Sequence, residues 1–284
     1  MHILITGSAG MLWTTLRMSQ IFEQAGHTMI YTDIGTFDIT SSQISYYLAT
    51  HTVDMIINCA AYTDVDNAED AWRIANYEIN TLALASLVHA LHGTSIKLLH
   101  ISTDYVFDGS KKEWNLTDDL VWPLNHYGIS KRLGEQLILR NYPHAKVIRT
   151  SRLYGGGWQF KNFVHTMLKL SETKKELSII DDQRWAPTYT GDLVDACLQL
   201  TNNRDSMIEK IYHCCNQTPA WWITRCRFAC EIFTLTQKNI TLTPITSAQY
   251  PTKATRPLHS WMISSPLLQL PERTQSLRRY LSTL

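Results

Sequence analysis

Short apolar runs alternate with segments of helical apolar spacing through the first half of the chain. Runs typical of buried strands lie at residues 2–6, 27–32, 53–58, 97–101 and 145–150. Helical spacing lies between them at 11–25 and 66–92, and a further helix carries Tyr127 and Lys131. Elements that alternate in this way form βαβ units around a parallel sheet, with ligands at the C-terminal ends of the strands. We therefore expect an α/β fold with a Rossmann-type, doubly wound parallel sheet.

The pattern becomes mixed from about residue 155. It predicts helices at 162–170, 191–200 and 222–235, and short strands at 178–180, 211–214 and 240–244. No repeat or low-complexity tract separates the two halves. We predict a Rossmann domain over residues 1–154 and a smaller mixed α/β lobe over 155–284. Within that lobe, the segment near 188–201 is expected to pack back on the Rossmann domain.

A glycine turn follows the first strand. Gly7 and Gly10 lead into the helix that begins near Met11 and Leu12. A strand, a glycine turn and a helix N-terminus form the geometry in which backbone amides bind a pyrophosphate. Asp33, after the second strand, can accept hydrogen bonds from an adenosine ribose and would repel a 2′-phosphate, which favours NADH over NADPH. The alternative is that Asp33 is an ordinary turn residue.

A hydroxyl, a phenol and an ammonium follow in an order suited to hydride transfer to a carbonyl. Thr103 comes directly after a strand, and Tyr127 and Lys131 share one helix face at a spacing of four residues. Tyr127 would give a proton to the carbonyl oxygen, and Lys131 would lower the pKa of that phenol. Thr103 would hold the oxygen. A tyrosine and a lysine at this spacing are usually a surface pair, so the prediction depends on the glycine turn and the run at 102–109.

Charge and composition argue against a nucleic-acid-binding, secreted or membrane-spanning protein. The chain has 284 residues, a formal net charge of +1 and no basic block, so nothing in it favours nucleic acid as a partner. Its N-terminus enters a strand without the pattern of a signal peptide, and no apolar run approaches the ~20 residues that span a bilayer. We expect a cytoplasmic protein that binds no membrane.

The cysteines do not have the spacing of a metal site. Cys214, Cys215, Cys226 and Cys230 fall within seventeen residues, but the CxxC spacing of structural zinc sites is missing. Cys214 and Cys215 lie next to each other in a predicted strand, so they point to opposite faces. We expect no metal and no disulfide, and we interpret the remaining pair, Cys59 and Cys197, as buried thiols.

Longer motifs resemble the extended short-chain dehydrogenase/reductase family, and within it the dTDP-4-dehydrorhamnose reductases. They are NCAAYTDVDNAE at 58–69, HISTDYVFDG at 100–109, PLNHYGISKRLGE at 123–135 and DDQRWAPTYTGDL at 181–193. The resemblance runs nearly end to end. It implies an NAD(P)H-dependent oxidoreductase that reduces the 4-keto group of dTDP-4-dehydro-6-deoxy-L-mannose to dTDP-L-rhamnose. It also implies that the first domain binds NAD(P) and the second lobe binds the sugar nucleotide.

The resemblance and the motifs together assign the site residues. Thr103, Tyr127 and Lys131 are the expected catalytic residues. The expected cofactor-binding residues are Gly7, Gly10, Met11, Leu12, Asp33, Asp38, Ile39, Ala60, Ala61, Tyr62, Ser102, Tyr127 and Lys131. The expected substrate-binding residues are Thr63, Val65, Thr103, Asp104, Arg152 and Arg256, where Arg256 would contact the diphosphate. Asp104 has a second interpretation as the cap of the following turn, and Arg256 as a surface arginine.

The chain departs from the family pattern at several positions. Trp13 replaces the third glycine of the turn, Arg152 stands where a tryptophan is common, and Trp185 stands where a glycine is usual. An acidic residue that links some members into magnesium-bound dimers falls near Thr14 and Thr15, which have no carboxylate. We therefore expect a monomer or a homodimer that is not linked by magnesium.

Two alternatives to this function stay open. One keeps the chemistry but changes the substrate to another nucleotide-linked keto-sugar. The other is a non-catalytic binding subunit like the regulatory subunit of methionine adenosyltransferase, which looks like the same family. Trp13, Arg152 and Trp185 favour that alternative, whereas the motifs at 102–109 and 181–190 favour a reductase.

Overall fold

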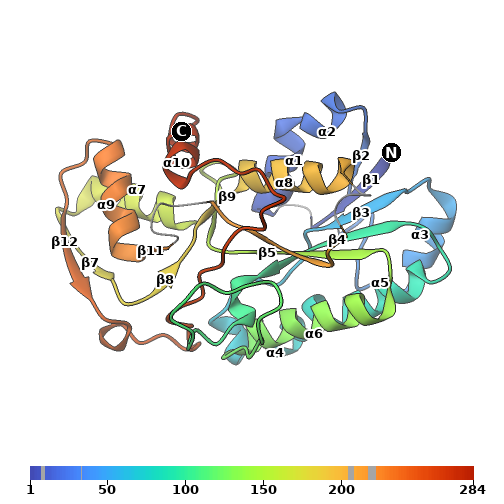
Figure 1. Ribbon diagram of the computed structural model, residues 1–284, viewed down its shortest axis with the longest axis horizontal. Coiled ribbons are helices and arrows are strands. Elements are labelled where there is room, and N and C mark those ends of the chain that lie inside the picture. Colours follow the sequence, from blue (N-terminus) through green and yellow to red (C-terminus); the bar gives the residue numbers. More distant parts are fainter. Residues whose placement is uncertain (8–9, 33, 204–207, 217–221) are drawn as a thin grey trace.

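The computed structural model describes residues 1–7, 10–32, 34–203, 208–216 and 222–284 (Figure 1). Its main body is a six-stranded sheet in the order β10-β5-β4-β3-β1-β2, in which all neighbouring strands are parallel. This sheet confirms the expected α/β class and its Rossmann-type arrangement. Its strands are β1 (His2–Thr6), β2 (Thr28–Tyr31), β3 (Met55–Asn58), β4 (Lys97–Thr103), β5 (Ala145–Thr150) and β10 (Ile211–Cys214).

Helices cover both faces of the sheet because alternate residues of its apolar strands point to opposite sides. Ile3 and Ile5 of β1 pack in the same cluster as Leu193, whereas Leu4 packs in the cluster of Leu87. The first face is covered by α1 (Met11–Ser19), α2 (Ile21–Gln24) and α8 (Thr190–Asn202). The second is covered by α3 (Ile44–Thr50), α5 (Ala83–Leu91) and α6 (His126–Asn141), with α4 (Arg73–Tyr77) beside α6.

Two helices predicted from periodicity are divided in the structure. The first is broken at Gln20, whose left-handed backbone (φ 52°) separates α1 from α2. The second consists of a 3₁₀ turn at Asn67–Glu69, α4, a π-helical turn at Glu78–Leu82 and α5. Apolar spacing continues across these breaks, so periodicity alone does not reveal them. The π-helical turn carries Asn80, which supports the candidate site.

The strand at residues 211–214 lies in the main sheet, whereas we had assigned it to the smaller lobe. As β10 it pairs in parallel with β5. The preceding helix, α8, packs its buried side against the sheet through Leu193, Val194 and Cys197. The chain therefore leaves the main body after β5 and returns to it before residue 215, and a cut at a single sequence position cannot describe this path.

A smaller lobe lies to one side of the sheet (Figure 1). Its core contains Trp185, Phe228, Tyr154 and Tyr280, which pack in one cluster. Short strand pairs and three helices surround this cluster. They are the parallel pairs β7 (Glu176–Ile180) with β12 (Thr241–Ile245) and β6 (Leu153–Tyr154) with β9 (Thr188–Tyr189), the antiparallel pair β8 (Arg184–Trp185) with β11 (Ile223–Thr224), and α7 (Phe163–Thr173), α9 (Arg225–Leu235) and α10 (Arg273–Leu281).

The structure adds three further observations on composition. Within the described ranges, no helix is both long and apolar enough to cross a membrane. The same residues contain no group of three or more metal-ligating side chains. All six cysteines are free thiols, and four of them, including Cys214 and Cys215, are buried.

Candidate active site

A cleft of about 930 Å³ opens at the C-terminal edge of the main sheet. Gly7, Ala60, Thr103 and Thr150 line it from the ends of four different strands. Parallel strands bring their carboxyl ends to one edge, which explains why residues so far apart in the chain meet here. The cleft gathers most of the residues expected to bind the cofactor: Gly7, Gly10, Met11, Leu12, Asp38, Ile39, Ala60, Ala61, Ser102, Tyr127 and Lys131.

The expected substrate-binding residues are only partly gathered there. Thr63, Thr103 and Arg152 line the cleft. Four other expected site residues do not: Tyr62, Val65, Asp104 and Arg256. Asp33 lies outside the described residues, so the structure says nothing about its contact with a ribose.

Gly7 sits where the chain turns from β1 toward the first helix. Its backbone is left-handed (φ +85°), a conformation that glycine adopts without strain. A Cβ at this position would lie 2.5 Å from the backbone nitrogen of Ala60. The absence of a side chain at Gly7 therefore allows the turn to approach the end of β3, and any residue with a Cβ would separate the two segments.

The N-terminus of α1 points a set of backbone amides toward the cleft. Gly10 is the N-cap residue and has no side chain that could accept hydrogen bonds from those amides. Gly10, Met11 and Leu12 all line the cleft. The Gly10 amide donates to the Gly7 carbonyl at 3.2 Å, but the first amides of a helix have no intrahelical acceptor and suit an anion, so this part of the cleft fits the pyrophosphate of a dinucleotide.

The segment after β3 is held by Asn80 of the π-helical turn. The Asn80 side chain accepts from the Tyr62 amide at 3.0 Å and donates to the Tyr62 carbonyl at 3.0 Å. It also donates to the hydroxyl of Ser130 on α6 at 3.1 Å. One buried amide therefore fixes the backbone that carries Ala60, Ala61 and Thr63 relative to the helix that carries Tyr127.

Helix α6 presents Tyr127, Lys131 and Glu135 one turn apart on its buried side. It begins at a cap formed by Asn125, whose side chain accepts from the Gly128 amide at 2.8 Å. Glu135 is fully buried and forms two hydrogen bonds with the guanidinium of Arg149 on β5, at 3.0 and 2.9 Å. The helix is thereby joined to the sheet directly below the two candidate catalytic residues.

The ammonium group of Lys131 is buried and faces polar groups of β4. Its Nζ donates to the Ile101 carbonyl at 2.7 Å and lies 3.2 Å from His100 Nε2. Burial lowers the pKa of Lys131 to about 8, against the opposing charges of Glu135 and Cys59. The group is therefore half-charged near pH 8, and its orientation is set by a strand rather than by Tyr127.

Burial raises the pKa of the Tyr127 phenol, and the neighbouring charge of Asp104 adds to that shift. We had expected Lys131 to lower this pKa, but the groups that do so are the Thr103 hydroxyl and the Arg152 guanidinium. The reason is the direction of the lysine side chain, which is hydrogen-bonded to Ile101. A phenol with a raised pKa keeps its proton, as a proton donor requires.

Asp104 joins the end of β4 to the C-terminal segment. Its carboxylate accepts from Ser260 at 2.5 Å and from Thr103 at 3.3 Å. Burial raises the pKa of Asp104, whereas Arg152 and these hydroxyls lower it. Asp104 lies beneath the cleft surface, where it orients the Thr103 hydroxyl.

Arg152 and Trp185, two residues that depart from the family pattern, are in contact. The Arg152 guanidinium lies over the ring of Trp185, 5.7 Å from its centroid, and over the ring of Tyr105 at 4.9 Å. Trp185 is 1% exposed and packs edge-on against Phe163 and Phe228 in the core of the smaller lobe. Trp185 is thus a core residue that also covers one side of Arg152.

The third departure, Trp13, is also accommodated without closing the cleft. Its ring packs edge-on against Tyr31 at 5.5 Å, and the Arg17 guanidinium lies 5.4 Å from its centroid. Trp13 lines the cleft. One turn nearby, the Thr15 hydroxyl bonds to Met11 and to Thr190, both at 2.9 Å. The expectation of a monomer or a homodimer that is not linked by magnesium remains a prediction.

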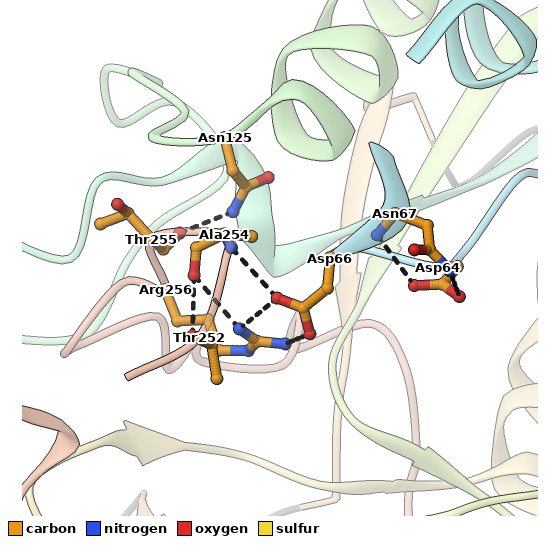
Figure 2. A network of polar contacts seen from close by, with 8 residues as sticks. All are labelled: Asp64, Asp66, Asn67, Asn125, Thr252, Ala254, Thr255 and Arg256. Atoms are coloured by element: carbon orange, nitrogen blue, oxygen red, sulfur yellow. Dashed lines mark hydrogen bonds and ion pairs between the residues drawn. The ribbon is translucent and has the colours of Figure 1, made fainter. Parts of the chain in front are cut away.

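Arg256 is bound to a carboxylate near the loop after β3 (Figure 2). Its two terminal nitrogens donate to the two oxygens of Asp66 at 3.0 and 2.6 Å. Asp66 also accepts from the Ala254 amide at 3.0 Å, and Asn125 donates to the Thr255 carbonyl at 2.8 Å. Arg256 therefore ties the C-terminal segment to the Rossmann body, and contact with a diphosphate remains a prediction.

The structure adds supporting residues that the sequence analysis missed. His100 contacts Lys131, and Asn58 lies 3.0 Å from the other ring nitrogen of His100. Glu135 and Arg149 form the buried ion pair beneath α6. A polar residue inside an apolar strand is the one signal that could have identified His100 and Asn58, because buried polar groups require partners.

Comparison with known proteins identifies the family of this chain. The family model described as the RmlD substrate binding domain matches residues 1–282. The chain belongs to this family. RmlD membership confirms the resemblance that the motifs predicted.

Individual RmlD relatives are similar over almost the whole chain. The spore coat polysaccharide biosynthesis protein SpsK of Bacillus subtilis is 36% identical over 91% of this chain and 87% of its own. A dTDP-4-dehydrorhamnose reductase of Aggregatibacter actinomycetemcomitans is 34% identical over 91% of this chain and 89% of its own. The crystal structure of a dTDP-4-dehydrorhamnose reductase from Bacillus anthracis, in complex with NADP, is 30% identical, with a TM-score of 0.91 over 100% of this chain and 99% of that one.

Proposed function

We propose that this chain reduces the 4-keto group of dTDP-4-dehydro-6-deoxy-L-mannose to dTDP-L-rhamnose with NADH or NADPH. The observation that carries the proposal is the convergence of Thr103, Tyr127 and Lys131 on a cleft that also contains the glycine turn. Relatives at 33–34% identity are named dTDP-4-dehydrorhamnose reductase, and they are matched over more than four fifths of their length. The family and the cleft therefore support the same chemistry.

Each catalytic side chain has a task that follows from its surroundings. Tyr127 holds a proton and gives it to the substrate oxygen as the carbonyl is reduced. Thr103 lines the cleft beside Tyr127; its single hydroxyl proton, which Asp104 accepts here, would turn to the same oxygen when the substrate binds. Lys131 lines the cleft and would supply positive charge to the bound cofactor. A bound reduced nicotinamide supplies the hydride.

The amides of α1 and the turn at Gly7 would hold the pyrophosphate of the cofactor. A nicotinamide dinucleotide is supported by the Bacillus anthracis relative, which was solved with NADP. We propose a preference for NADH because Asp33, which follows the second predicted strand in the sequence, would repel a 2′-phosphate. Titration of both reduced cofactors checks this preference, and tighter binding of NADPH would contradict it.

We propose that residues 1–154 form the cofactor-binding part and that the later lobe supplies the sugar-nucleotide pocket. We also propose a cytoplasmic monomer or homodimer without magnesium. What supports the division is the position of the cleft, which lies at the edge of the main sheet and is lined from the later lobe by Lys161. The molar mass in solution with and without a chelator tests the oligomeric part.

The test of the function is the Tyr127→Phe variant. We expect kcat for the 4-keto-6-deoxy sugar nucleotide to fall by about 10²–10⁴, because proton donation to the substrate oxygen is lost. Tyr46→Phe is the matched control, because Tyr46 is 71% exposed on α3. Equal kcat values for Tyr127→Phe and wild type would overturn the proposal that this chain is a reductase. Cofactor binding without turnover of any keto-sugar would favour the non-catalytic alternative.

A further inference from the structure

Arg152 is a cationic side chain of the cleft that has no assigned partner among the described residues. It follows β5 and lines the cleft together with Thr103 and Tyr127. Its Nε and one terminal nitrogen, Nη2, are buried and have no hydrogen-bond partner in the described part of the protein. Its backbone is left-handed (φ 47°), a conformation that costs free energy in a residue other than glycine.

The faces of the Arg152 guanidinium are covered by aromatic rings. Tyr105 lies 4.9 Å away and Trp185 lies 5.7 Å away, measured from the guanidinium carbon to each ring centroid. Both rings are nearly inaccessible to solvent and are held by the surrounding core. A planar cation that contacts rings through its faces keeps its N–H groups at its edge, so Arg152 is rigid and able to bind a planar or tetrahedral oxyanion.

No carboxylate of the described residues is bound directly to Arg152. Arg256 already takes the carboxylate of Asp66. The charges of Arg152 and Arg256 help burial to lower the pKa of nearby Arg225 to about 10. The carboxylate of Asp104 attracts Arg152, but its own oxygens accept hydrogen bonds from the hydroxyls of Ser260 and Thr103.

Buried guanidinium donors without acceptors are costly, and a ligand that supplies oxygens would remove that cost. Guanidinium pairs with carboxylates or phosphates are among the strongest hydrogen-bonded pairs in proteins. We propose that Arg152 binds an oxyanion of the substrate, close to the carbonyl group to which Tyr127 donates its proton. The inference rests on the proposed function for its substrate class, a nucleotide-linked sugar.

Such a substrate offers two sources for the oxyanion. One is the diphosphate that joins the nucleoside to the sugar. The other is a carboxylate on the sugar itself, which would extend the substrate range to nucleotide-linked uronates. Both present oxygens that match the edge of a guanidinium, so affinity measurements must separate them.

The experiment measures dissociation constants by calorimetry for dTDP, dTDP-glucose and dTDP-glucuronate. The proteins are wild type, Arg152→Met and the matched control Arg140→Met, whose residue lies exposed on the last turn of α6. If the diphosphate is the partner, Arg152→Met weakens all three ligands by the same factor, about 10- to 100-fold. If the carboxylate is the partner, dTDP-glucuronate alone is weakened by that factor, and wild type binds it more tightly than dTDP-glucose.

Unchanged affinity for all three ligands in Arg152→Met would overturn the inference. Arg152→Lys guards against a variant that fails to fold, since it keeps the charge without the guanidinium edge. We expect an intermediate loss of affinity for Arg152→Lys, and wild-type affinity in that variant would also contradict the proposed contact. Thermal melting of each variant reports its folding independently.

Binding and turnover separate this inference from the proposed function. A wild-type protein that binds these ligands through Arg152 but reduces no keto-sugar would overturn only the reductase. Turnover of dTDP-4-dehydro-6-deoxy-L-mannose with no effect of Arg152→Met on any dissociation constant would overturn only the role of Arg152. A wild-type protein that binds none of the three ligands would overturn both.

Discussion

At the scale of single residues, burial determines the charge states in the cleft. Lys131 is 2% exposed, and its pKa falls to about 8 because the surrounding apolar strands disfavour its ammonium form. Tyr127 shifts in the direction that keeps its phenol neutral for the same reason. Tyr127 therefore keeps its proton at neutral pH, as a proton donor requires, whereas Lys131 titrates near pH 8.

The lysine pKa leads to a prediction about stability. In the unfolded chain Lys131 has an ordinary pKa near 10.4, so between about pH 8 and pH 10 the unfolded state binds more protons than the folded state. Stability from this residue therefore rises with pH across that window. We expect the free energy of unfolding of wild type, relative to Lys131→Met, to increase from pH 7.5 to pH 10, as measured in urea.

The matched control for this titration is Lys238→Met. Lys238 is exposed and follows α9. We expect the difference in the free energy of unfolding between wild type and Lys238→Met to stay constant across the same pH range. Tyrosines with raised pKa values change stability in the opposite direction, but they are present in every protein compared. A difference between wild type and Lys131→Met that stays constant from pH 7.5 to pH 10 would contradict the lowered pKa.

At the scale of elements, α6 connects the reacting residues to the sheet. Tyr127, Lys131 and Glu135 follow one another at one-turn intervals, and Glu135 is bonded to Arg149 and to the Ser102 hydroxyl, the latter at 2.6 Å. The helix therefore cannot shift along β4 and β5 without breaking buried hydrogen bonds. This attachment keeps the phenol in register with Thr103.

We predict that Glu135→Gln destabilises the protein by about 3–5 kcal/mol, because it leaves the Arg149 charge buried without a partner. Chemical denaturation measures the loss. A second variant, Glu135→Gln with Arg149→Met, removes the uncompensated charge and should recover part of the stability. If the single variant were as stable as wild type, the pair would not hold α6 to the sheet.

At the scale of the whole molecule, the C-terminal segment returns to the Rossmann body. Residues 252–256 are bound by Asp66 and Asn125, which lie in the loop after β3 and at the start of α6 (Figure 2). The same loop carries Thr63, which lines the cleft. The contact therefore couples the position of the later lobe to the position of the substrate segment.

Asp66→Asn tests this coupling. We expect a small loss of stability at pH 7, about 0.5–1 kcal/mol, because Asp66 is partly exposed to solvent. Arg256 lowers the pKa of Asp66, so its stabilisation is present above pH 4 and is lost as the pH falls below that value. The larger effect should be a raised KM with little change in kcat. Asp118→Asn, on an exposed loop, is the control, and an unchanged KM in Asp66→Asn would contradict the coupling.

The sequence by itself determined the class of fold and the chemistry of the site. Apolar runs such as 2–6 and 53–58 predict strands because a strand buried on both faces needs continuous apolar residues. The order of the elements then implies the parallel sheet and the edge at which ligands bind. Gly7, Thr103, Tyr127 and Lys131 could be selected in advance because each follows a strand or shares a helix face.

Tertiary structure decided what depends on neighbours distant in sequence. β10 pairs with β5, although the chain between them forms part of the smaller lobe. No local sequence pattern predicts such a pairing. Arg256 is bound to Asp66, 190 residues away, and Arg152 lies between Tyr105 and Trp185. The direction of Lys131 and the charge of its ammonium depend on the burial that the folded sheet imposes. Local spacing determines which side chains are available, whereas packing determines which partners they have and which charges they keep.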